Sequence, residues 1–169
     1  IEVTVEAEDA QGATVQEVMN ITITGENDDP VFANGGLAVL EDNDNTMDLT
    51  TLVTDADADD SGASMTYTVT GAPASGIASI VNGDELQFQT NGAFEALNAG
   101  ASTTVTVEVT ADDGNGGTDT SDITVTINGV NDDPTLAAAA DAVTESAVST
   151  IDLTALGADA DAEDDGTSR

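Results

Sequence analysis

A repeat with a period of 104 residues constrains the fold of this chain more than any other feature. The motif Asn-Asp-Asp-Pro ends at Pro30 and recurs ending at Pro134, 104 positions later. The agreement continues without a gap on both sides of the motif. The aligned segments are Ala7-Glu8-Asp9 with Ala111-Asp112-Asp113, Glu41 with Glu145, and Asp55-Ala56-Asp57 with Asp159-Ala160-Asp161. A period of this length indicates whole domains in tandem rather than a solenoid of small units.

The repeat divides the chain into three parts. Residues 31–134 form one complete repeat, which at about 100 residues is long enough to bury a core of its own. Residues 1–30 are the C-terminal strands of a preceding repeat, and residues 135–169 are the N-terminal part of the following one. Neither flank is long enough for a domain, and an isolated hairpin is marginally stable in water. We therefore expect that the flanks are cut from a longer protein or that they pack against neighbouring segments.

Alternation of apolar and polar residues predicts an all-β fold. Strands are expected at 37–41, 47–53, 65–70, 77–81, 86–89, 104–110 and 123–128, with turn residues between them. The alternation breaks at 94–97, where one short helical turn is expected. About seven strands in one repeat predict an immunoglobulin-like Greek-key β-sandwich. Aromatic residues are few, so we expect this small aliphatic core to need outside stabilisation.

The charge of the chain excludes several classes of partner. There are 34 acidic residues and one basic residue, Arg169, which gives a formal net charge of −33. Such a surface repels nucleic acid and anionic membranes, so neither is expected as a direct partner. It also repels itself, and metal cations are the obvious counter-charge. The alternative is a generally acidic surface, as in salt-adapted proteins.

The remaining composition argues against catalysis, disulfides and membrane insertion. With no histidine, lysine or cysteine, the usual nucleophiles lack a base or partner, and thiolate metal sites cannot form. A glycosidase with two carboxylates is formally possible, but the few aromatics offer no sugar-stacking platform. No apolar run approaches the length of a membrane span. We predict that the chain is not an enzyme.

The acidic residues gather in recurring motifs that suit calcium, which binds six to eight oxygen ligands. The segment from Asp55 to Gly62 is the densest cluster, but it is not an EF-hand. Counted from Asp55, the sixth position is Asp60 instead of glycine, and the twelfth is Thr66 instead of glutamate. The loop must therefore share ligands with other segments. Asp59, Asp60 and Asp113 are expected to cap turns or face solvent.

The topology of a sandwich groups the predicted ligands at two poles. At the pole where the chain enters, the loop after the second strand and the end of the sixth strand meet the linker. The ligands predicted there are Asn27, Asp28, Asp29, Asp55, Asp57 and Asp112. Those predicted at the opposite pole are Glu41, Asn131, Asp132, Asp133, Asp159 and Asp161.

These residues resemble a known family. The linker Gly25-Glu26-Asn27-Asp28-Asp29-Pro30 is similar to the cadherin linker Asp-x-Asn-Asp-Asn-x-Pro, with glycine in place of the first aspartate and no spacer before proline. Asp55-Ala56-Asp57 resembles the cadherin Asp-Ala-Asp loop, and Ala111-Asp112 resembles the Ala-x-Asp strand end with one residue fewer. Glu41 takes the place of the early glutamate. Nothing matches the Asp-Arg-Glu motif, for which Glu95 is a candidate replacement.

The end of the repeat extends this resemblance. Residues 94–100, the strand at 105–109 and residues 128–132 read like the ending of a VCBS repeat. The chain thus resembles the cadherin-like, VCBS-type repeats of giant calcium-dependent RTX-type adhesins at the bacterial cell surface. The resemblance implies Ca²⁺ between successive domains, which stiffens the string of repeats, and an extracellular location with a role in adhesion and biofilm formation. The neighbouring repeats would be the partners, and other domains of the parent would bind the surface ligand.

The function expected from these observations is that of a calcium-stiffened extender repeat, which projects a distal binding region from the cell. The first alternative is a calcium-dependent module that itself binds a glycan or a protein. The second is a subunit of an extracellular filament, suggested by the incomplete flanks. The two flanks together are shorter than one repeat, so strand exchange alone cannot complete a domain.

Overall fold

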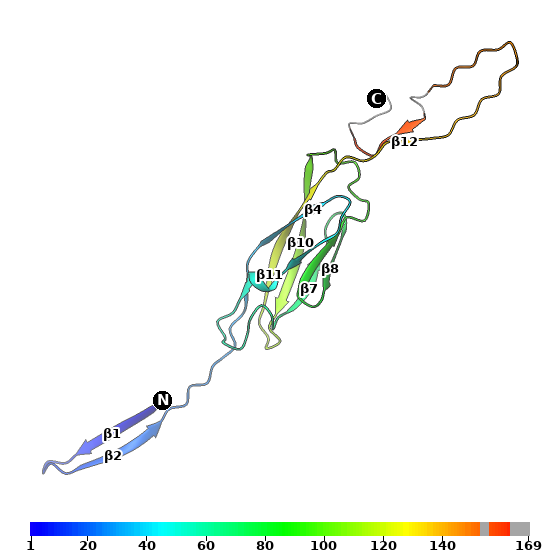
Figure 1. Cartoon of the computed structure of the whole chain (residues 1–169). Coiled ribbons are helices and arrows are strands. Elements are labelled where there is room, and N and C mark those ends of the chain that lie inside the picture. Colours follow the sequence, from blue (N-terminus) through cyan, green and yellow to red (C-terminus); the bar gives the residue numbers. More distant parts are fainter. Residues whose placement is uncertain (153–155, 163–169) are drawn as a thin grey trace.

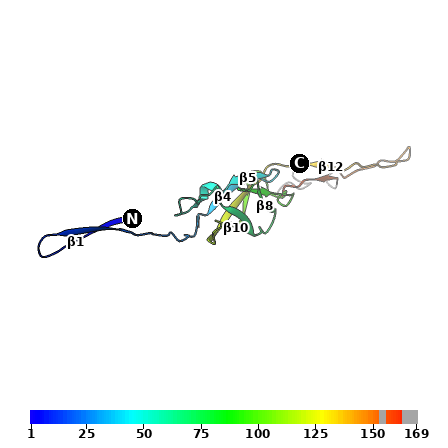
Figure 2. The same cartoon turned by 90° about the horizontal axis from the view of Figure 1, so that it is seen from below.

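The computed structural model describes residues 1–152 and 156–162, and strands make up nearly all of its regular structure. Among these residues there is no α-helix, and the one helical element is the 3-10 turn η1 (Thr50–Leu52). A hairpin, a sandwich and an extended segment follow one another along the chain (Figure 1), and the perpendicular view in Figure 2 shows the same order. The chain enters the sandwich at one end, here called the N-terminal pole, and leaves at the opposite end, the C-terminal pole.

The first sheet of the sandwich has the order β4-β11-β10-β7. Its strands are β4 (Gly35–Leu40), β7 (Thr66–Gly71), β10 (Ser102–Asp112) and β11 (Thr118–Asn128). All neighbours are antiparallel except β4 and β11, which run parallel. The first and last long strands of the repeat therefore lie side by side and point to the same pole.

The second layer is built from shorter strands. β5 (Asn45–Asp48), β9 (Glu85–Gln89) and β8 (Ile77–Val81) form one sheet, and β3 (Val31–Phe32) pairs with β6 (Val53–Thr54). β5 and β6 are separated only by Leu49 and the η1 turn, so together they occupy one strand position. The architecture confirms the predicted all-β, immunoglobulin-like Greek-key sandwich.

The core lies between the two layers and is mainly aliphatic. Val107, Val109, Ile123 and Val125 on β10 and β11 are fully buried, as the alternation of apolar residues predicts. The second layer contributes Leu86 and Phe88 of β9, and the loops add Leu49 and Phe94. The Phe88 and Phe94 rings lie 6.3 Å apart, and the Phe32 and Tyr67 rings pack edge to face at 5.8 Å.

Most predicted strands are found, with three differences. The stretch 47–53 is not one strand, because Asp48 Oδ1 accepts hydrogen bonds from the Thr50 backbone and hydroxyl and turns the chain into η1. The two-residue strand β3 is too short to show alternation, and it was not predicted. The expected helical turn at 94–97 is a turn closed by the Leu97 N–H and the Phe94 carbonyl at 2.9 Å. The strand at 77–81 has the predicted bounds.

The flanks reproduce pieces of the central repeat. β1 (Glu2–Glu8) and β2 (Thr14–Asn20) form a hairpin that corresponds, 104 residues earlier, to parts of β10 and β11. β12 (Thr135–Leu136) pairs with β13 (Gly157–Ala158) in the register that β3 and β6 show 104 residues before. Residues 153–155 and 163–169 of the predicted partial repeat lie outside the described residues. The division at 30 and 134 stays a prediction.

Candidate cation sites at the two poles

The acidic loop after β6 folds onto the linker at the N-terminal pole. Asp55 Oδ1 accepts the backbone N–H of Asp57 at 2.9 Å, which turns the loop and directs the Asp57 carboxylate at the linker. Asp57 Oδ2 then accepts the backbone N–H of Asp28 at 2.8 Å. The second carboxylate oxygen of Asp55 is buried without a hydrogen-bond partner. The acidic loop is thereby joined to the linker by a side chain of the loop and a backbone N–H of the linker.

Asp113, rather than the predicted Asp112, faces the linker. Asp113 is buried, and its Oδ2 accepts a 2.8 Å hydrogen bond from Asn27 Nδ2. The bond from Asn27, followed by those from the turn N–H groups of residues 115–117, lowers the pKa of Asp113. Asp112 is exposed and accepts the Gly114 N–H, and its predicted role as a ligand beside the linker stays a prediction. The inward alternation of Val107, Val109 and Ala111 continues to Asp113 and was the sequence signal for it.

Asp29 lies close to the same carboxylate. A side chain on Gly117 would come within 2.4 Å of Asp113 Oδ2 and 2.9 Å of Asp29 Oδ1, so both acidic groups border this glycine. Only a residue without a side chain leaves room for two carboxylates in this place. The glycine thus allows the tip of the β10–β11 hairpin to approach the linker.

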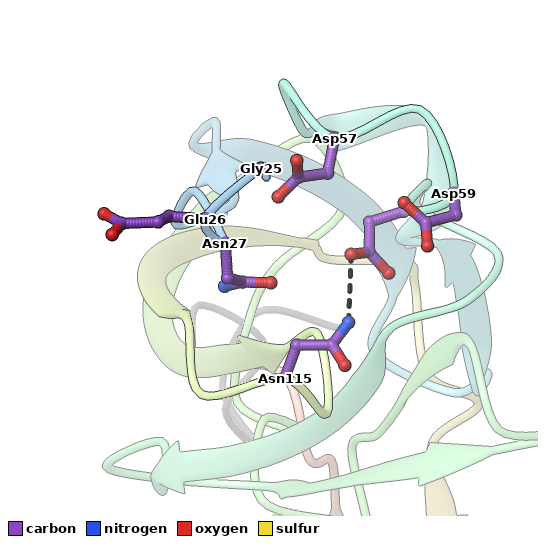
Figure 3. Close-up of a pocket in the computed structure, with 7 residues that line it drawn as sticks. Gly25, Glu26, Asn27, Asp57, Asp59 and Asn115 are labelled. Atoms are coloured by element: carbon purple, nitrogen blue, oxygen red, sulfur yellow. Dashed lines mark hydrogen bonds between the residues drawn. The ribbon is translucent and has the colours of Figure 1, made fainter. Parts of the chain in front are cut away.

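An open hollow of about 350 Å³ lies between the linker, the acidic loop and the β10–β11 hairpin (Figure 3). It is lined by Gly25, Glu26, Asn27, Asp57, Asp59, Asp60 and Asn115. Asn115 Nδ2 donates to Asp60 Oδ2 at 3.1 Å, which joins the loop to the hairpin. Burial raises the pKa of Asp60, with smaller contributions from Asp59, Asp55 and Asp113. Asp59 and Asp60, both expected to cap turns or face solvent, line this open hollow; Asp59 is exposed and Asp60 is half-buried.

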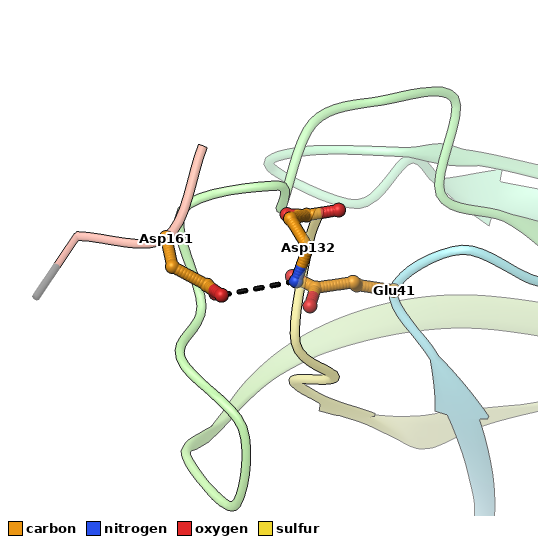
Figure 4. Close-up of side chains that lie close together, drawn as sticks. All are labelled: Glu41, Asp132 and Asp161. Carbon is orange, nitrogen blue, oxygen red and sulfur yellow. Dashed lines mark hydrogen bonds between the residues drawn. The ribbon is translucent and has the colours of Figure 1, made fainter. Parts of the chain in front are cut away.

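At the C-terminal pole, three carboxylates converge in a buried position (Figure 4). Glu41, just after β4, is fully buried, and its Oε1 accepts the Val130 N–H at 2.7 Å. Asp161 is 5% exposed, and its Oδ2 accepts the Asp132 N–H at 3.0 Å. One carboxylate oxygen each of Glu41, Asp132 and Asp161 has no hydrogen-bond partner, and the three side chains can offer oxygens within 4.8 Å of one another.

This cluster has no counter-charge among the described residues, because the only basic side chain of the sequence, Arg169, lies outside them. Burial, and then the negative charge of Asp161, raise the pKa of Asp132. Leaving several carboxylates buried and unpaired is costly, so the arrangement calls for a cation. All donors are oxygens, which favours a hard ion such as Ca²⁺ over metals that prefer nitrogen or sulfur.

Two further carboxylates border this cluster and were not among the predicted ligands. Asp42, Glu95 and Asp132 can also offer oxygens within 4.8 Å of one another. Burial and the charge of Asp132 raise the pKa of Glu95. The sequence marks Glu95 only as a candidate replacement for the missing Asp-Arg-Glu motif, and nothing in it points to Asp42 except its place beside Glu41.

Two of the remaining predicted ligands, Asp159 and Asn131, form hydrogen bonds at the C-terminal pole. Asp159 Oδ1 accepts the Asp161 N–H at 3.1 Å, and Asn131 Nδ2 donates to the Asp132 carbonyl at 2.7 Å. Asn131 and Asp133 are exposed. Asn27, Asp28 and Asp29 are likewise exposed at the other pole.

The hydrogen bonds at the two poles correspond with a shift of 104 residues. The bond from Asp28 N to Asp57 Oδ2 recurs from Asp132 N to Asp161 Oδ2. The bond from Asp57 N to Asp55 Oδ1 within the acidic loop recurs from Asp161 N to Asp159 Oδ1. The bond from Asn27 Nδ2 to the Asp28 carbonyl within the linker recurs from Asn131 Nδ2 to the Asp132 carbonyl. Each linker thus meets the acidic loop that follows it in the same way.

Comparison with known proteins identifies the sandwich. A family described as bacterial Ig domain matches residues 27–126, which is more than half of the chain. A search of the curated proteins finds no match. No helix in the described part of the chain has the length and apolar character needed to cross a membrane.

Two solved structures show loose similarity. An endo-fucoidan hydrolase of glycoside hydrolase family 107 is 16% identical with a TM-score of 0.37, over 74% of this chain and 22% of that chain. A nucleoside hydrolase-related hypothetical protein from Saccharophagus degradans, associated with carbohydrate metabolism, is 18% identical with a TM-score of 0.34, over 62% and 26% of the two chains. The chain spans about a quarter of each protein or less.

Proposed function

The chain belongs to the bacterial Ig domain family, and from this premise we propose that it is a calcium-stiffened extender of a large bacterial surface protein. Domains of this family are typically extracellular or surface-exposed and generally non-catalytic. The observation that carries the proposal is the group of unpartnered buried carboxylate oxygens of Glu41, Asp132 and Asp161. They come from one sandwich, its linker and the segment that follows, so one ion would join all three.

The stiffening follows from the charges at each linker. Without a cation, the carboxylates on both sides of the linker repel one another, and the joint has no single favoured angle. A shared Ca²⁺ would replace this repulsion with attraction. Extracellular calcium modules bind with dissociation constants of about 10⁻⁴ to 10⁻³ M, so millimolar calcium would fill such sites. Mg²⁺ suits them less, because it demands strict octahedral geometry and retains its waters.

The parent protein is part of the same proposal. The cadherin-like linker and the VCBS-like ending of the repeat support an RTX-type adhesin, in which repeats of this kind hold a distal binding region away from the cell. The neighbouring repeats would be the direct partners. No catalytic role is proposed, since the carboxylates at the poles have no histidine, lysine or cysteine to work with.

Calcium titration and small-angle scattering test this function on the whole chain. We expect millimolar Ca²⁺ to lengthen the particle and raise its melting temperature, and equimolar Mg²⁺ to do so much less.

Glu41→Gln keeps the acceptor for Val130 and removes the charge, so it should weaken the response to calcium. Glu17→Gln makes the same change on the exposed β2 strand and should leave the response intact. If neither the shape nor the melting temperature changes with calcium, the proposal is refuted, and the acidic residues are then explained as a generally acidic surface. If calcium acts on neither but the chain captures a glycan or protein in its presence, the binding-module alternative holds.

A further inference from the structure

The parallel pairing of β4 and β11 determines how the sandwich carries tension. Gly35 pairs with Ile123, and the pairing continues to Leu40 with Asn128. The chain enters at the pole where β4 begins and leaves at the pole where β11 ends (Figure 1). Pulling on the two linkers therefore loads the hydrogen bonds between β4 and β11 along the strands, all at once.

The C-terminal ends of these two strands are joined by Glu41. Its backbone N–H donates to the Asn128 carbonyl at 3.0 Å, and its Oε1 accepts the Val130 N–H at 2.7 Å. Its other oxygen, Oε2, is buried without a partner, and Glu41, Asp132 and Asp161 can offer carboxylate oxygens within 4.8 Å of one another. Glu41 thus lies between the end of β4 and the outgoing linker.

We infer that a cation held by Glu41, Asp132 and Asp161 acts as a tension bypass through the sandwich. Force entering at Pro30 runs along β3 and β4 to Glu41, crosses the ion to Asp132, and continues into the outgoing linker. Residues 42–131, which include β5 to β11, are then outside the loaded path. The inference rests on the proposed function, because it requires calcium at this site.

The bypass differs from ordinary stabilisation by a ligand. A ligand that only favours the folded state stabilises it whatever the direction of pulling. A bypass protects residues 42–131 from unfolding only when the force crosses the ion. This requires one attachment point before Glu41 in the chain and the other after Asp132. The direction of pulling therefore separates the two mechanisms.

Single-molecule force measurements on the whole chain test the inference. The chain has no cysteine, so pairs of introduced cysteines give unique attachment points. Gly25→Cys with Ala137→Cys pulls across the ion, whereas Ser75→Cys with Thr104→Cys pulls within residues 42–131. Calcium at about ten times its dissociation constant should slow unfolding across the ion about tenfold at a fixed force. Unfolding between the inner points should slow by less than about twofold, since the site is still intact when the loaded strands separate.

Two charge variants and one control complete the experiment. Glu41→Gln should abolish the calcium effect on pulling across the ion, and Asp132→Asn serves the same purpose if the first variant folds poorly. Glu17→Gln should retain the effect. Equal slowing in both pulling directions would overturn the bypass and leave calcium as a general stabiliser, with the extender function standing. Absence of calcium binding by titration would overturn the extender function itself.

Discussion

Asp113 and Glu41 show two opposite solutions for a buried carboxylate in the same domain. Asp113 accepts hydrogen bonds from Asn27 and from three turn N–H groups, so its charge is stabilised by the protein alone. Glu41 accepts one bond on Oε1 and leaves Oε2 without a partner. Asp113 therefore holds the linker in place through its hydrogen bonds, whereas the free Oε2 of Glu41 is available to bind a cation.

Neutralising Asp113 should change how the domain responds to acid. The pKa of Asp113 lies below its ordinary value of 3.8, so its contribution to stability is complete above about pH 5 and is lost as the pH falls through the lowered pKa. Asp113→Asn should reduce stability at neutral pH and flatten the loss of stability between about pH 5 and pH 2. Acid unfolding followed by circular dichroism in chelator measures this. Asp112→Asn, on the exposed neighbour, is the control; an equal effect of both variants would contradict the anchoring role.

Among the structural elements, the acidic loop after β6 depends on close packing at its end. Gly62 lies so near the η1 turn that a side chain there would come within 2.0 Å of the Thr50 carbonyl oxygen. The Tyr67 hydroxyl also donates to the Gly62 carbonyl at 2.7 Å. Burial of this hydroxyl raises the pKa of Tyr67 to about 12. The loop is thus fixed at the end opposite to Asp55 and Asp57.

Gly62→Ala should displace this loop. The forced overlap with the Thr50 backbone should cost about 1–3 kcal/mol of folding free energy, the usual range for overpacking. Because the loop carries Asp55 and Asp57, the calcium binding that we propose at the N-terminal pole should weaken as well. Denaturant unfolding and calcium titration measure the two effects. Gly25→Ala, which meets nothing within 4 Å, should change stability by less than about 0.5 kcal/mol; a similarly small effect at Gly62 would contradict the packing argument.

Period-2 alternation was enough to predict most of these elements and part of the site. It located the centres of β10 and β11, because each has one face in the core, whereas the strand at 77–81 was located by the Asn82-Gly83 turn that follows it. It could not foresee η1, which depends on a local bond between Asp48 and Thr50. Asp113 was predictable from the same alternation. The approach of Asp42 and Glu95 was not, since it depends on how distant turns meet at the C-terminal pole.

At the scale of the whole molecule, the sandwich contains the one hydrophobic core found among residues 1–152 and 156–162. The β1–β2 hairpin is exposed throughout: Val3 and Val5 are 38% and 47% exposed, whereas their equivalents in the complete repeat, Val107 and Val109, are fully buried. A two-stranded hairpin without a packed face is marginal in water. The stability of the chain is therefore concentrated in residues 31–134.

Hydrogen exchange should divide the chain accordingly. Backbone amides of β1 and β2 should exchange rapidly, whereas those of β10 and β11 should exchange only on global unfolding, because they lie in the centre of the sandwich. Mass spectrometry of fragments after exchange measures the contrast within one sample. The amides of the fully buried Val107 and Ile123 serve as the reference for slow exchange, with which the amides of the hairpin are compared. Protection of the hairpin equal to that of β10 would show that its exposed face is covered in solution.

The match between the two poles also bears on how a gene of this kind can change. The bonds between Asn27, Asp28 and Asp57 recur 104 residues later with the same donors and acceptors. A recombination event that removes or duplicates 104 codons, wherever it begins within the repeat, therefore rebuilds the same junction. The length of such a protein can be inherited as a variable trait while every joint keeps its chemistry.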